Sequence, residues 1–353
     1  MSANASSGVG SVGRTPRIVS LESELLQVVV LPAKGCDIYS LRDVASGIDV
    51  LAKTRLGLAD LQPAGYASSS AEAWLSQYLG GWQLVLPNGG AAAQVQGAEW
   101  GFHGEACVLR WSVDEQSAAS MAASVRLLRA PLLVRRWLDV KGATLTVRES
   151  VTNESASAID VMWTHHPAFG APFLDGRCIV STGARTITAD DETPGTVLAA
   201  GSVHKWPSAQ GSDGAMVRLD EVAAAGSGVA HLAYLSEFDS GFFAITNPQL
   251  RLGVAFRWPI EVFPCAWYWV EAGASKGFPW YGSYYTLAVE PATSWPGQGI
   301  ANLRAKGGVP LTLAPDEECE VELEVTLFHD DRRVVGVDPG GAIEFSHVGE
   351  SSQ

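Results

Sequence analysis

Two histidines stand side by side at the end of an apolar stretch, in residues 163–170. A second apolar stretch, residues 284–289, is followed by Glu290. The unperturbed pKa of histidine lies near neutrality, so this side chain donates or accepts a proton at working pH. A carboxylate at the mouth of an apolar strand is desolvated, which raises its pKa toward that of a useful base. The two segments therefore predict a general acid and a general base in one cleft, formed by Glu290 and either His165 or His166.

Strand geometry allows only one of the two histidines to face that cleft. Successive side chains of a strand point to opposite faces, so His165 and His166 must separate, and the sequence alone does not decide between them. Pro167 and Pro291 lack the N–H that a sheet ladder needs and are expected to end their strands. The alternative for each segment is structural: two histidines that close a strand, and a terminal charge that meets water.

Other polar and aromatic side chains are candidates for the same cleft. His103 has glycines close by on both sides, in a turn that would present its ring. Asn88 precedes two glycines and can either hydrogen-bond a polyol or cap a turn. Trp267 and Trp269 belong to a crowded aromatic segment, and an indole face can stack on the C–H face of a sugar ring, although a sheet core also buries tryptophan.

The net negative charge of the chain excludes some classes of binding partner. The net charge is −14, with 24 Lys and Arg against 38 Asp and Glu. Phosphate binding needs clustered Lys and Arg, so no nucleic acid is expected as a partner, and anionic membrane surfaces are disfavoured as well. No HxH or HExxH spacing occurs, and the glycine-containing segment at residues 82–90 has no GxGxxG, so neither a metal nor a cofactor is expected. A small molecule bound by a monomer or a homodimer is the expectation.

Cysteine usage and the N-terminus predict a cytoplasmic protein. The first 15 residues are small and polar, without the apolar region of a signal peptide. No stretch approaches the roughly 18 apolar residues that a membrane helix needs. An odd number of widely spaced cysteines indicates buried free thiols in a reducing compartment; they are Cys36, Cys107, Cys178, Cys265 and Cys319.

Signals for short β-strands dominate the chain. Residues 319–328 alternate apolar side chains with Glu and Thr, which is typical of a strand with one buried face. Residues 145–151 and 158–163 predict a hairpin joined by residues 152–157. One short helix is expected after Ser69, where Glu72 completes a capping box. Further strands are expected at residues 25–31, 106–113, 133–140, 230–235, 242–246, 252–258, 266–271 and 284–289.

These signals predict an all-β fold with few short helices, either a sandwich or a barrel. We find no linker that must divide the chain, so a single domain is expected over residues 16–335. Residues 1–15 and 336–353 are expected to be tails.

Taken together, the segments resemble the aldose 1-epimerase (galactose mutarotase-like) family, in a divergent branch. Members carry a His-Gly turn, a strand that ends in His followed by an aromatic residue, and a late strand that ends in Glu-Pro. Here the matching residues occur in the same order, over roughly residues 25–328: His103-Gly104, His166 with Phe169, and Glu290-Pro291. The resemblance implies a large antiparallel β-supersandwich.

The resemblance also implies a reaction, the interconversion of the anomers of a free or modified monosaccharide. Glu290 would take the proton of the anomeric hydroxyl, and His166 would protonate the ring oxygen. His103 would bind the sugar and help to polarise the ring oxygen. The other expected substrate-binding residues are Asn88, His165, Trp267 and Trp269.

The chain departs from the better-known members in two places, and two other functions stay open. The segment around Asn88 offers no Arg before His103, and three residues compete as the Asp that holds a sugar hydroxyl: Asp190, Asp191 and Asp239. The same fold class hosts other sugar enzymes, epimerases or lyases that act beside a carbonyl, and non-catalytic carbohydrate-binding modules.

Overall fold

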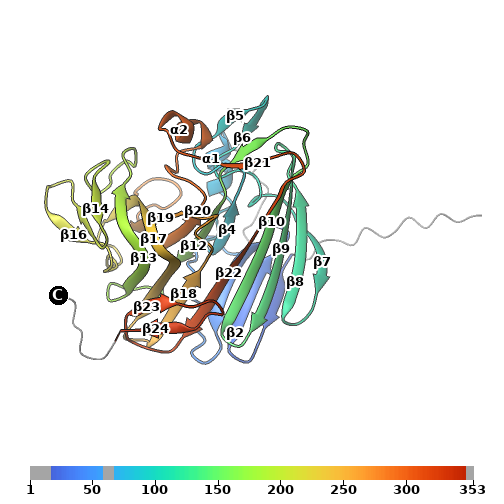
Figure 1. The fold of residues 1–353 in the computed structure, drawn as a ribbon. Helices are drawn as coiled ribbons and strands as arrows, with labels where there is room; N and C mark the ends of the chain where they lie inside the picture. Colours follow the sequence, from blue (N-terminus) through green and yellow to red (C-terminus); the bar gives the residue numbers. More distant parts are fainter. Residues whose placement is uncertain (1–16, 59–66, 347–353) are drawn as a thin grey trace, which may run out of the picture.

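The structure, a computed structural model, describes residues 17–58 and 67–346. The expected tail at residues 1–15 lies outside these residues. In the described part of the chain, 16 strands form one antiparallel sheet, and four separate pairs of short strands surround it (Figure 1). The predicted all-β architecture with few short helices is confirmed.

The first half of the chain contains twelve strands and one helix within the described ranges. They are β1 (Val19–Glu22), β2 (Leu26–Leu31), β3 (Asp37–Asp43), α1 (Ser70–Leu75), β4 (Trp82–Val85), β5 (Ala93–Val95), β6 (Ala98–Trp100), β7 (Ser112–Gln116), β8 (Ser120–Arg126), β9 (Leu132–Lys141), β10 (Thr144–Asn153), β11 (Ile159–Val161) and β12 (Thr164–Phe169).

The second half, up to residue 346, contains the remaining elements. They are β13 (Ile179–Ala189), β14 (Val203–Lys205), β15 (Ser208–Gln210), β16 (Met216–Arg218), β17 (Ala230–Asn247), β18 (Leu252–Arg257), β19 (Cys265–Ala272), β20 (Tyr285–Ala292), α2 (Ile300–Ala305), β21 (Leu311–Leu313), β22 (Glu318–Phe328), β23 (Val334–Val337) and β24 (Ile343–Phe345).

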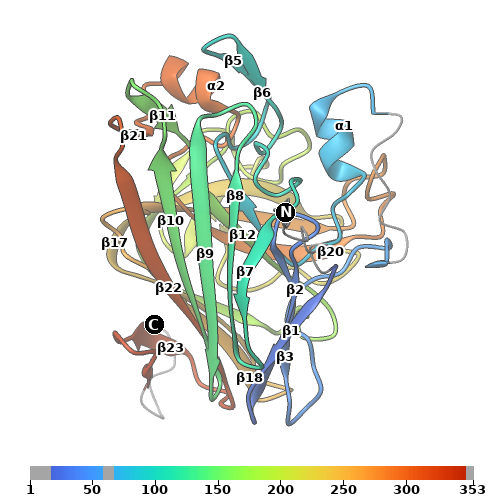
Figure 2. The ribbon, with the colours of Figure 1, turned by 90° about the vertical axis from the view of Figure 1, so that its right-hand side faces the viewer.

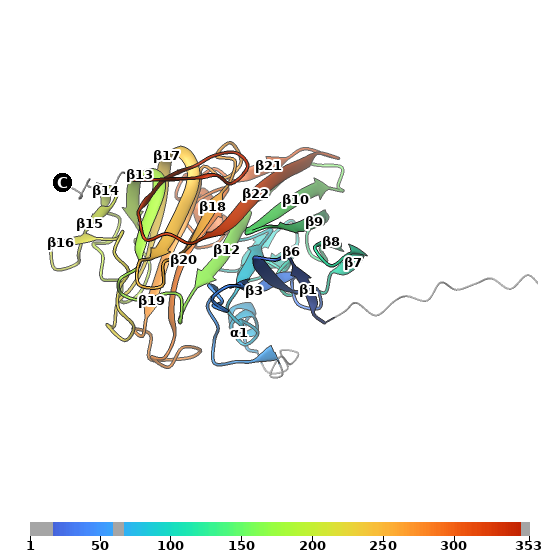
Figure 3. The same ribbon diagram turned by 90° about the horizontal axis from the view of Figure 1, so that it is seen from below.

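The large sheet is strongly curved. Its strand order is β1-β2-β3-β4-β12-β20-β19-β17-β18-β22-β10-β9-β8-β7, with β13 and β14 branching from β17. Figure 2 shows β7 to β10 in front, with the N-terminal strands β1 to β3 beside them. The N–H of Glu22, at the end of β1, donates to the carbonyl of Ala118 between β7 and β8 at 2.9 Å. The two ends of the sheet therefore meet, while β14 to β16 project on the opposite side of the molecule (Figure 3).

Alternation along the strands decides which side chains form the core. On β22, Val321, Leu323 and Val325 are buried, whereas Glu320 and Glu322 are exposed, as the sequence pattern predicts. β12 has all six residues buried, because β4 and β20 flank it in the middle of the sheet and both of its faces are covered. Strands of this kind carry no polar–apolar alternation for sequence analysis to detect.

Several local expectations are wrong. Pro167 and Pro291 do not end their strands: β12 continues to Phe169 and β20 to Ala292. Pro167 falls where the ladder between β12 and β20 lapses, from Thr164 to Ala168, so its missing N–H costs no hydrogen bond there. A tail was expected over residues 336–353, yet β24 forms an ordered strand at Ile343–Phe345 within it.

Three further errors concern which segments form strands and how these strands are connected. The predicted hairpin around residues 152–157 does not form, because β10 pairs with β9 and β22 while β11 pairs with β21. Residues 106–111 form turns rather than a strand. The strands expected at residues 230–235 and 242–246 are parts of one 18-residue strand, β17.

The helix signal is accurate in position. The hydroxyl of Ser69 accepts from the N–H of Glu72 at 3.1 Å, and the Glu72 carboxylate accepts from the N–H of Ser68 at 2.8 Å. α1 and α2 have six residues each. Over the described ranges, no helix has the length and apolar character needed to cross a membrane.

Candidate active site

A row of side chains crosses five neighbouring strands on one face of the sheet. The pairs Thr164↔Ala292 and Ala168↔Ala288 place His166 of β12 opposite Glu290 of β20. On the outer sides, Glu290 is opposite Trp267 of β19 and His166 is opposite Gln83 of β4. Trp267 in turn is opposite Tyr234 of β17. Residues directly opposite on neighbouring strands share a face and lie in contact range, so the register itself brings the acid–base pair together.

The three middle residues of this row, His166, Glu290 and Trp267, line a cavity of about 260 Å³, and His103 lines it as well. Six aromatic side chains make up most of its wall: Trp74, Tyr78, Phe102, Trp267, Trp269 and Trp280. Leu75 and Leu232, with the backbone of Gly90 and Gly297, complete the lining. The three candidate catalytic residues, drawn from residues 103 to 290 of the chain, therefore border one pocket.

His166 and Glu290 form a close, buried pair. The Nε2 atom of His166 lies 3.6 Å from Oε1 of Glu290, and both side chains are almost completely buried. Burial raises the pKa of Glu290 well above its ordinary value and lowers the pKa of His166 to about 4. Desolvation thus favours the neutral pair, with one proton that resides on Glu290. The charge-separated form differs only by the transfer of this proton to His166.

His103 is held as a hydrogen-bond donor. Its backbone φ is +56°, in the left-handed region. Its N–H donates to the carbonyl of Gly90 at 3.0 Å, and its Nδ1 accepts from the N–H of Gly90 at 3.1 Å. Since Nδ1 accepts, the ring proton is assigned to Nε2. Burial lowers the pKa of His103 well below its ordinary value, so the ring is a neutral donor.

His165 lies on the other face of β12, as strand alternation requires. Its Nδ1 accepts from the indole N–H of Trp82 at 3.2 Å, and its Nε2 is 3.5 Å from the carboxylate of Glu149. Glu149 also pairs with Arg136 at 2.6 Å in the core. The structure therefore does not bring His165 to the cavity with His166, and its expected contact with substrate has no support in this geometry.

Asn88 is buried and fully engaged in joining loops. Its amide donates to the carbonyls of Ala91 and Gly101, both at 2.9 Å, and its carbonyl accepts from the N–H of Ile300 at 2.8 Å. No hydrogen-bonding capacity of the side chain faces the cavity. The structure thus assigns Asn88 the turn-capping alternative, at the start of α2.

Trp267 and Trp269 both line the cavity, from two successive inward positions of β19. The indole N–H of Trp267 donates to the carbonyl of Ser294 at 2.9 Å, which fixes the plane of the ring. A Cβ added at Gly297 would lie 3.0 Å from that ring, so the loop after β20 packs closely against it. Trp267 therefore presents a rigid apolar surface to the cavity.

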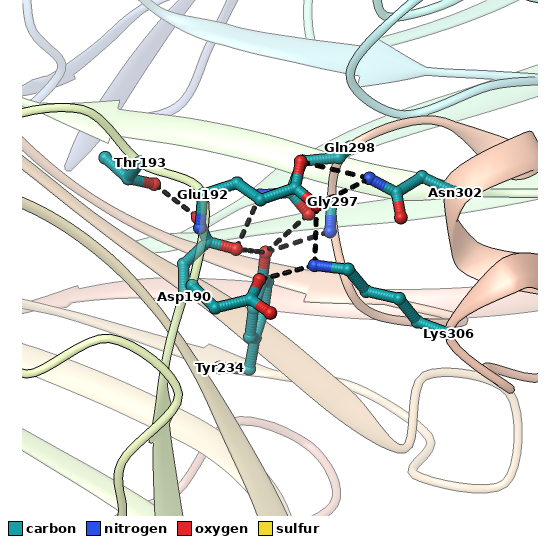
Figure 4. A network of polar contacts seen from close by, with 9 residues as sticks. Asp190, Glu192, Thr193, Tyr234, Gly297, Gln298, Asn302 and Lys306 are labelled. Carbon is teal, nitrogen blue, oxygen red and sulfur yellow. Dashed lines mark hydrogen bonds and ion pairs between the residues drawn. The ribbon is translucent and has the colours of Figure 1, made fainter.

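None of the three competing aspartates lines this cavity. Asp190 accepts from the hydroxyls of Tyr234 and Thr193 at 2.7 and 2.6 Å, and also from Gln298 and the N–H of Glu192 (Figure 4). Asp191 pairs with Lys306 and Asp239 with Arg185, both near the surface. The hydroxyl of Tyr234 also accepts from the N–H of Gly297 at 3.0 Å, so Asp190 supports the cavity wall from behind.

Trp74, Tyr78 and Phe102 line the cavity, although no sequence pattern assigned them to it. Trp74 and Tyr78 follow the capping box at helical spacing, together with Leu75 and Leu79, and such an apolar stripe predicts burial without indicating what it packs against. The ring of Trp74 lies 4.7 Å from that of His103 and packs on the cavity side of the sheet. Phe102 precedes His103 directly, and this adjacency was the one usable signal. Across the residues that the structure describes, no group of three or more His, Cys, Asp or Glu side chains is arranged to hold a metal ion.

The architecture defines a known class of protein fold. The Slr1438 protein of Synechocystis sp. PCC 6803 is similar with a TM-score of 0.65, over 92% of this chain and 100% of its own, at 14% identity. A galactose mutarotase-like protein of Clostridium acetobutylicum has a TM-score of 0.62, over 88% of this chain and 95% of its own, at 16% identity. A putative aldose 1-epimerase of Escherichia coli K12 has a TM-score of 0.61, over 88% of this chain and 98% of its own, at 17% identity. The chain therefore has the galactose mutarotase-like β-supersandwich fold; at these identities the likeness concerns the fold alone.

The sequence itself assigns the family within this class. Residues 13–327 match the family described as "Domain of unknown function (DUF4432)", and the chain belongs to it. No curated protein matches the chain by sequence.

Proposed function

We propose that this protein is a sugar-processing enzyme that interconverts the anomers of a monosaccharide. The observation that carries the proposal is the His166–Glu290 pair, 3.6 Å apart in a buried, aromatic cavity that also contains His103. The anomeric oxygen and the ring oxygen of a sugar are bonded to the same carbon. A group that takes a proton from one and a group that gives a proton to the other must therefore stand a few ångströms apart, as these two do.

The size of the cavity supports a single sugar ring. Its volume of about 260 Å³ is below the roughly 300–1,000 Å³ of pockets that hold drug-sized ligands. The indole of Trp267 offers a flat surface for the C–H face of a ring. The putative aldose 1-epimerase and the galactose mutarotase-like protein among the structural neighbours are consistent with the proposal through their fold.

The reaction needs one proton shared by the pair. Hydrogen bonds from the anomeric hydroxyl to Glu290 and from His166 to the ring oxygen favour the charge-separated form of the pair. Glu290 then takes the proton of the anomeric hydroxyl, the bond between C1 and the ring oxygen breaks, and His166 protonates that oxygen. After rotation about C1–C2, the ring closes on the other face, and both protons return to their donors. His103 donates from Nε2 to the ring oxygen or to a neighbouring hydroxyl.

Exchange of anomers measured by saturation-transfer NMR tests the proposal. We expect Glu290→Gln and His166→Ala each to lower the rate by about 10²–10⁴-fold, because each removes one of the two proton carriers. His231→Gln is the matched control. His231 is equally buried, and its pKa is lowered to about 4 in the same way, but it stacks on Tyr268 outside the cavity. Its substitution should leave the rate unchanged.

Two results would overturn the assignment. Full activity of Glu290→Gln would remove the mechanism. Deuterium from solvent that appears on a carbon atom of the sugar would point instead to an epimerase or a lyase, because anomer exchange breaks no bond between carbon and hydrogen. Saturable sugar binding without any acceleration would identify a carbohydrate-binding module.

A further inference from the structure

The cavity is poor in groups that hydrogen-bond hydroxyls. Among the described residues that line it, there is no Asn, Gln, Asp, Ser, Thr, Lys or Arg side chain. Apart from His103, His166 and Glu290, the polar side-chain atoms of the wall are the hydroxyl of Tyr78 and the indole N–H groups, and the backbone of Gly90 and Gly297 adds its own polar atoms. A fully hydroxylated sugar carries several further hydroxyls around the ring, each of which needs a partner once it leaves water.

Several of these remaining polar atoms are already engaged. The indole N–H of Trp74 donates to Sγ of Cys107 at 3.1 Å, and that of Trp267 donates to Ser294. The hydroxyl of Tyr78 accepts from the hydroxyl of Tyr284 at 3.3 Å. Both backbone groups of Gly90 bond to His103, and the N–H of Gly297 donates to Tyr234. What remains for a ligand beyond the acid–base pair and His103 is the donor capacity of Tyr78, the indole N–H groups of Trp269 and Trp280, and the carbonyl of Gly297.

The polar residues nearby are committed elsewhere. The side-chain amide of Asn88 forms hydrogen bonds with three backbone groups of the loops around the cavity. Asp190 accepts from four donors behind the wall, as Figure 4 shows. Gln83 is opposite His166 on β4 but does not line the cavity, and its amide N–H groups donate to the carbonyl of Gly80 at 2.6 Å and to Asp37 at 3.3 Å. The apolar character of the wall is thus built in rather than the result of one side-chain rotamer.

We infer that the substrate is a monosaccharide in which hydroxyls away from the anomeric centre are missing or blocked: a deoxy, O-methyl or O-acyl aldose. This inference rests on the proposed function for the reacting end of the sugar. The acid–base pair and His103 satisfy the anomeric hydroxyl, the ring oxygen and one neighbour. The aromatic wall then contacts methyl, methylene or acyl groups, whose removal from water is favourable.

Matched pairs of sugars test the inference: D-glucose against 3-O-methyl-D-glucose and 6-deoxy-D-glucose, and D-galactose against D-fucose. We expect kcat/KM for anomer exchange to be about 10- to 100-fold higher for the deoxy or O-methyl member of at least one pair, because an apolar pocket discriminates against an added hydroxyl by this order. Equal or higher values for the fully hydroxylated member of every pair would overturn the inference and leave the proposed function intact.

A substitution in the cavity wall tests whether the lack of polar side chains causes the preference for deoxy or O-methyl sugars. Leu232 lines the cavity on β17, opposite Trp269. Leu232→Asn adds an amide to the wall and should reduce the preference about tenfold, whereas the size-matched control Leu232→Met should keep it. An unchanged preference in Leu232→Asn, with wild-type turnover of the preferred sugar, would contradict a role for wall polarity.

Binding separates the two proposals. Glu290→Gln binds without turnover, and tryptophan fluorescence reports the affinity for each sugar of the panel. Tighter binding of the deoxy or O-methyl sugars without exchange in the wild-type protein would support the inferred ligand class and overturn the mutarotase. Absence of binding by every sugar would overturn both.

Discussion

At the scale of single residues, Glu290 is the side chain whose chemistry depends most on its surroundings. Burial in an aromatic cavity raises its pKa well above the ordinary value, and burial lowers that of His166 to about 4. The active form of the pair holds one proton, so activity should persist from above pH 4 to the raised pKa of Glu290. We expect a plateau of kcat/KM through neutrality, measured by NMR exchange. A fall in rate as the pH drops through 6.5 would show instead that His166 titrates at its ordinary value.

The same carboxyl group predicts a pH-dependent change in stability. A folded-state pKa above the unfolded value, near 4.3, gives a contribution that is complete below pH 4.3 and is lost as the pH rises toward the folded-state pKa. Glu290→Gln removes this loss. The free energy of unfolding of the variant relative to the wild type should therefore grow by about 1.4 kcal/mol per pH unit above pH 4.3, until the pH reaches the folded-state pKa of Glu290.

Urea unfolding between pH 4.5 and 8 measures this difference. Glu322→Gln, at an exposed position of β22, is the matched control and should leave the pH dependence unchanged. A constant difference between Glu290→Gln and the wild type across this range would mean that Glu290 is ionised in the folded protein.

At the scale of elements, β9 and β10 contain a second buried charge cluster, which approaches His165 on the face of β12 opposite to His166. Arg136 of β9 is opposite Glu149 of β10, and the two side chains pair at 2.6 Å while fully buried. Glu149→Gln leaves Arg136 without its counter-charge and should lower the free energy of unfolding by about 3–5 kcal/mol. The double variant Arg136→Met/Glu149→Leu, which removes both charges, should recover much of this loss.

Thermal and urea unfolding measure both variants of the charge cluster. Because β12 keeps His166 on the other face, anomer exchange should persist in Glu149→Gln at temperatures where the variant is folded. An unfolding free energy equal to that of the wild type in Glu149→Gln would show that the pair contributes nothing net to stability.

What the sequence reveals differs between elements for physical reasons. β22 is half exposed, so its alternation is visible in the sequence and the prediction for residues 319–328 is accurate. β12 is covered on both faces, and Pro167 misled the prediction of its end because proline is tolerated where the ladder lapses. His165 and His166 separate as alternation requires. Which of them meets Glu290 depends on the register with β20, and no local pattern encodes this.

The candidate site could likewise be predicted from the sequence only in part. The types of His103, His166 and Glu290, and their order in the chain, were sufficient to nominate them. Asn88 looked equally suitable, but its amide is used by loops that meet only in the folded protein. The wall residues Trp74 and Tyr78 carried a helix pattern and no sign of what they cover.

At the scale of the whole molecule, four histidines in the described part of the chain make the stability of the fold sensitive to acid. His103, His165, His166 and His231 all have pKa values lowered by burial, to about 4 for the last three. The unfolded chain binds protons at these sites below pH 6.5 while the folded chain does not. Stability should therefore fall as the pH drops from 6.5 toward 4, by up to about 1.4 kcal/mol per pH unit for each histidine.

Thermal unfolding from pH 7.5 to 4.5 measures this acid sensitivity. His231→Phe, outside the cavity, removes one titrating group and should make the decline less steep without affecting anomer exchange. A melting temperature that does not change between pH 7 and pH 5 would contradict neutral buried histidines.

The position of β20 in the sheet has a consequence for the synthesis of the protein. β20 inserts between β12 and β19, both of which leave the ribosome before it. Until residue 292 emerges, β12 and β19 each have an edge whose backbone groups lack their partner, and such edges recruit other chains. A polypeptide that ends before this point lacks Glu290 and exposes two strands with an unpaired edge. Premature termination should therefore yield aggregated protein that the cell degrades, rather than a weakly active enzyme.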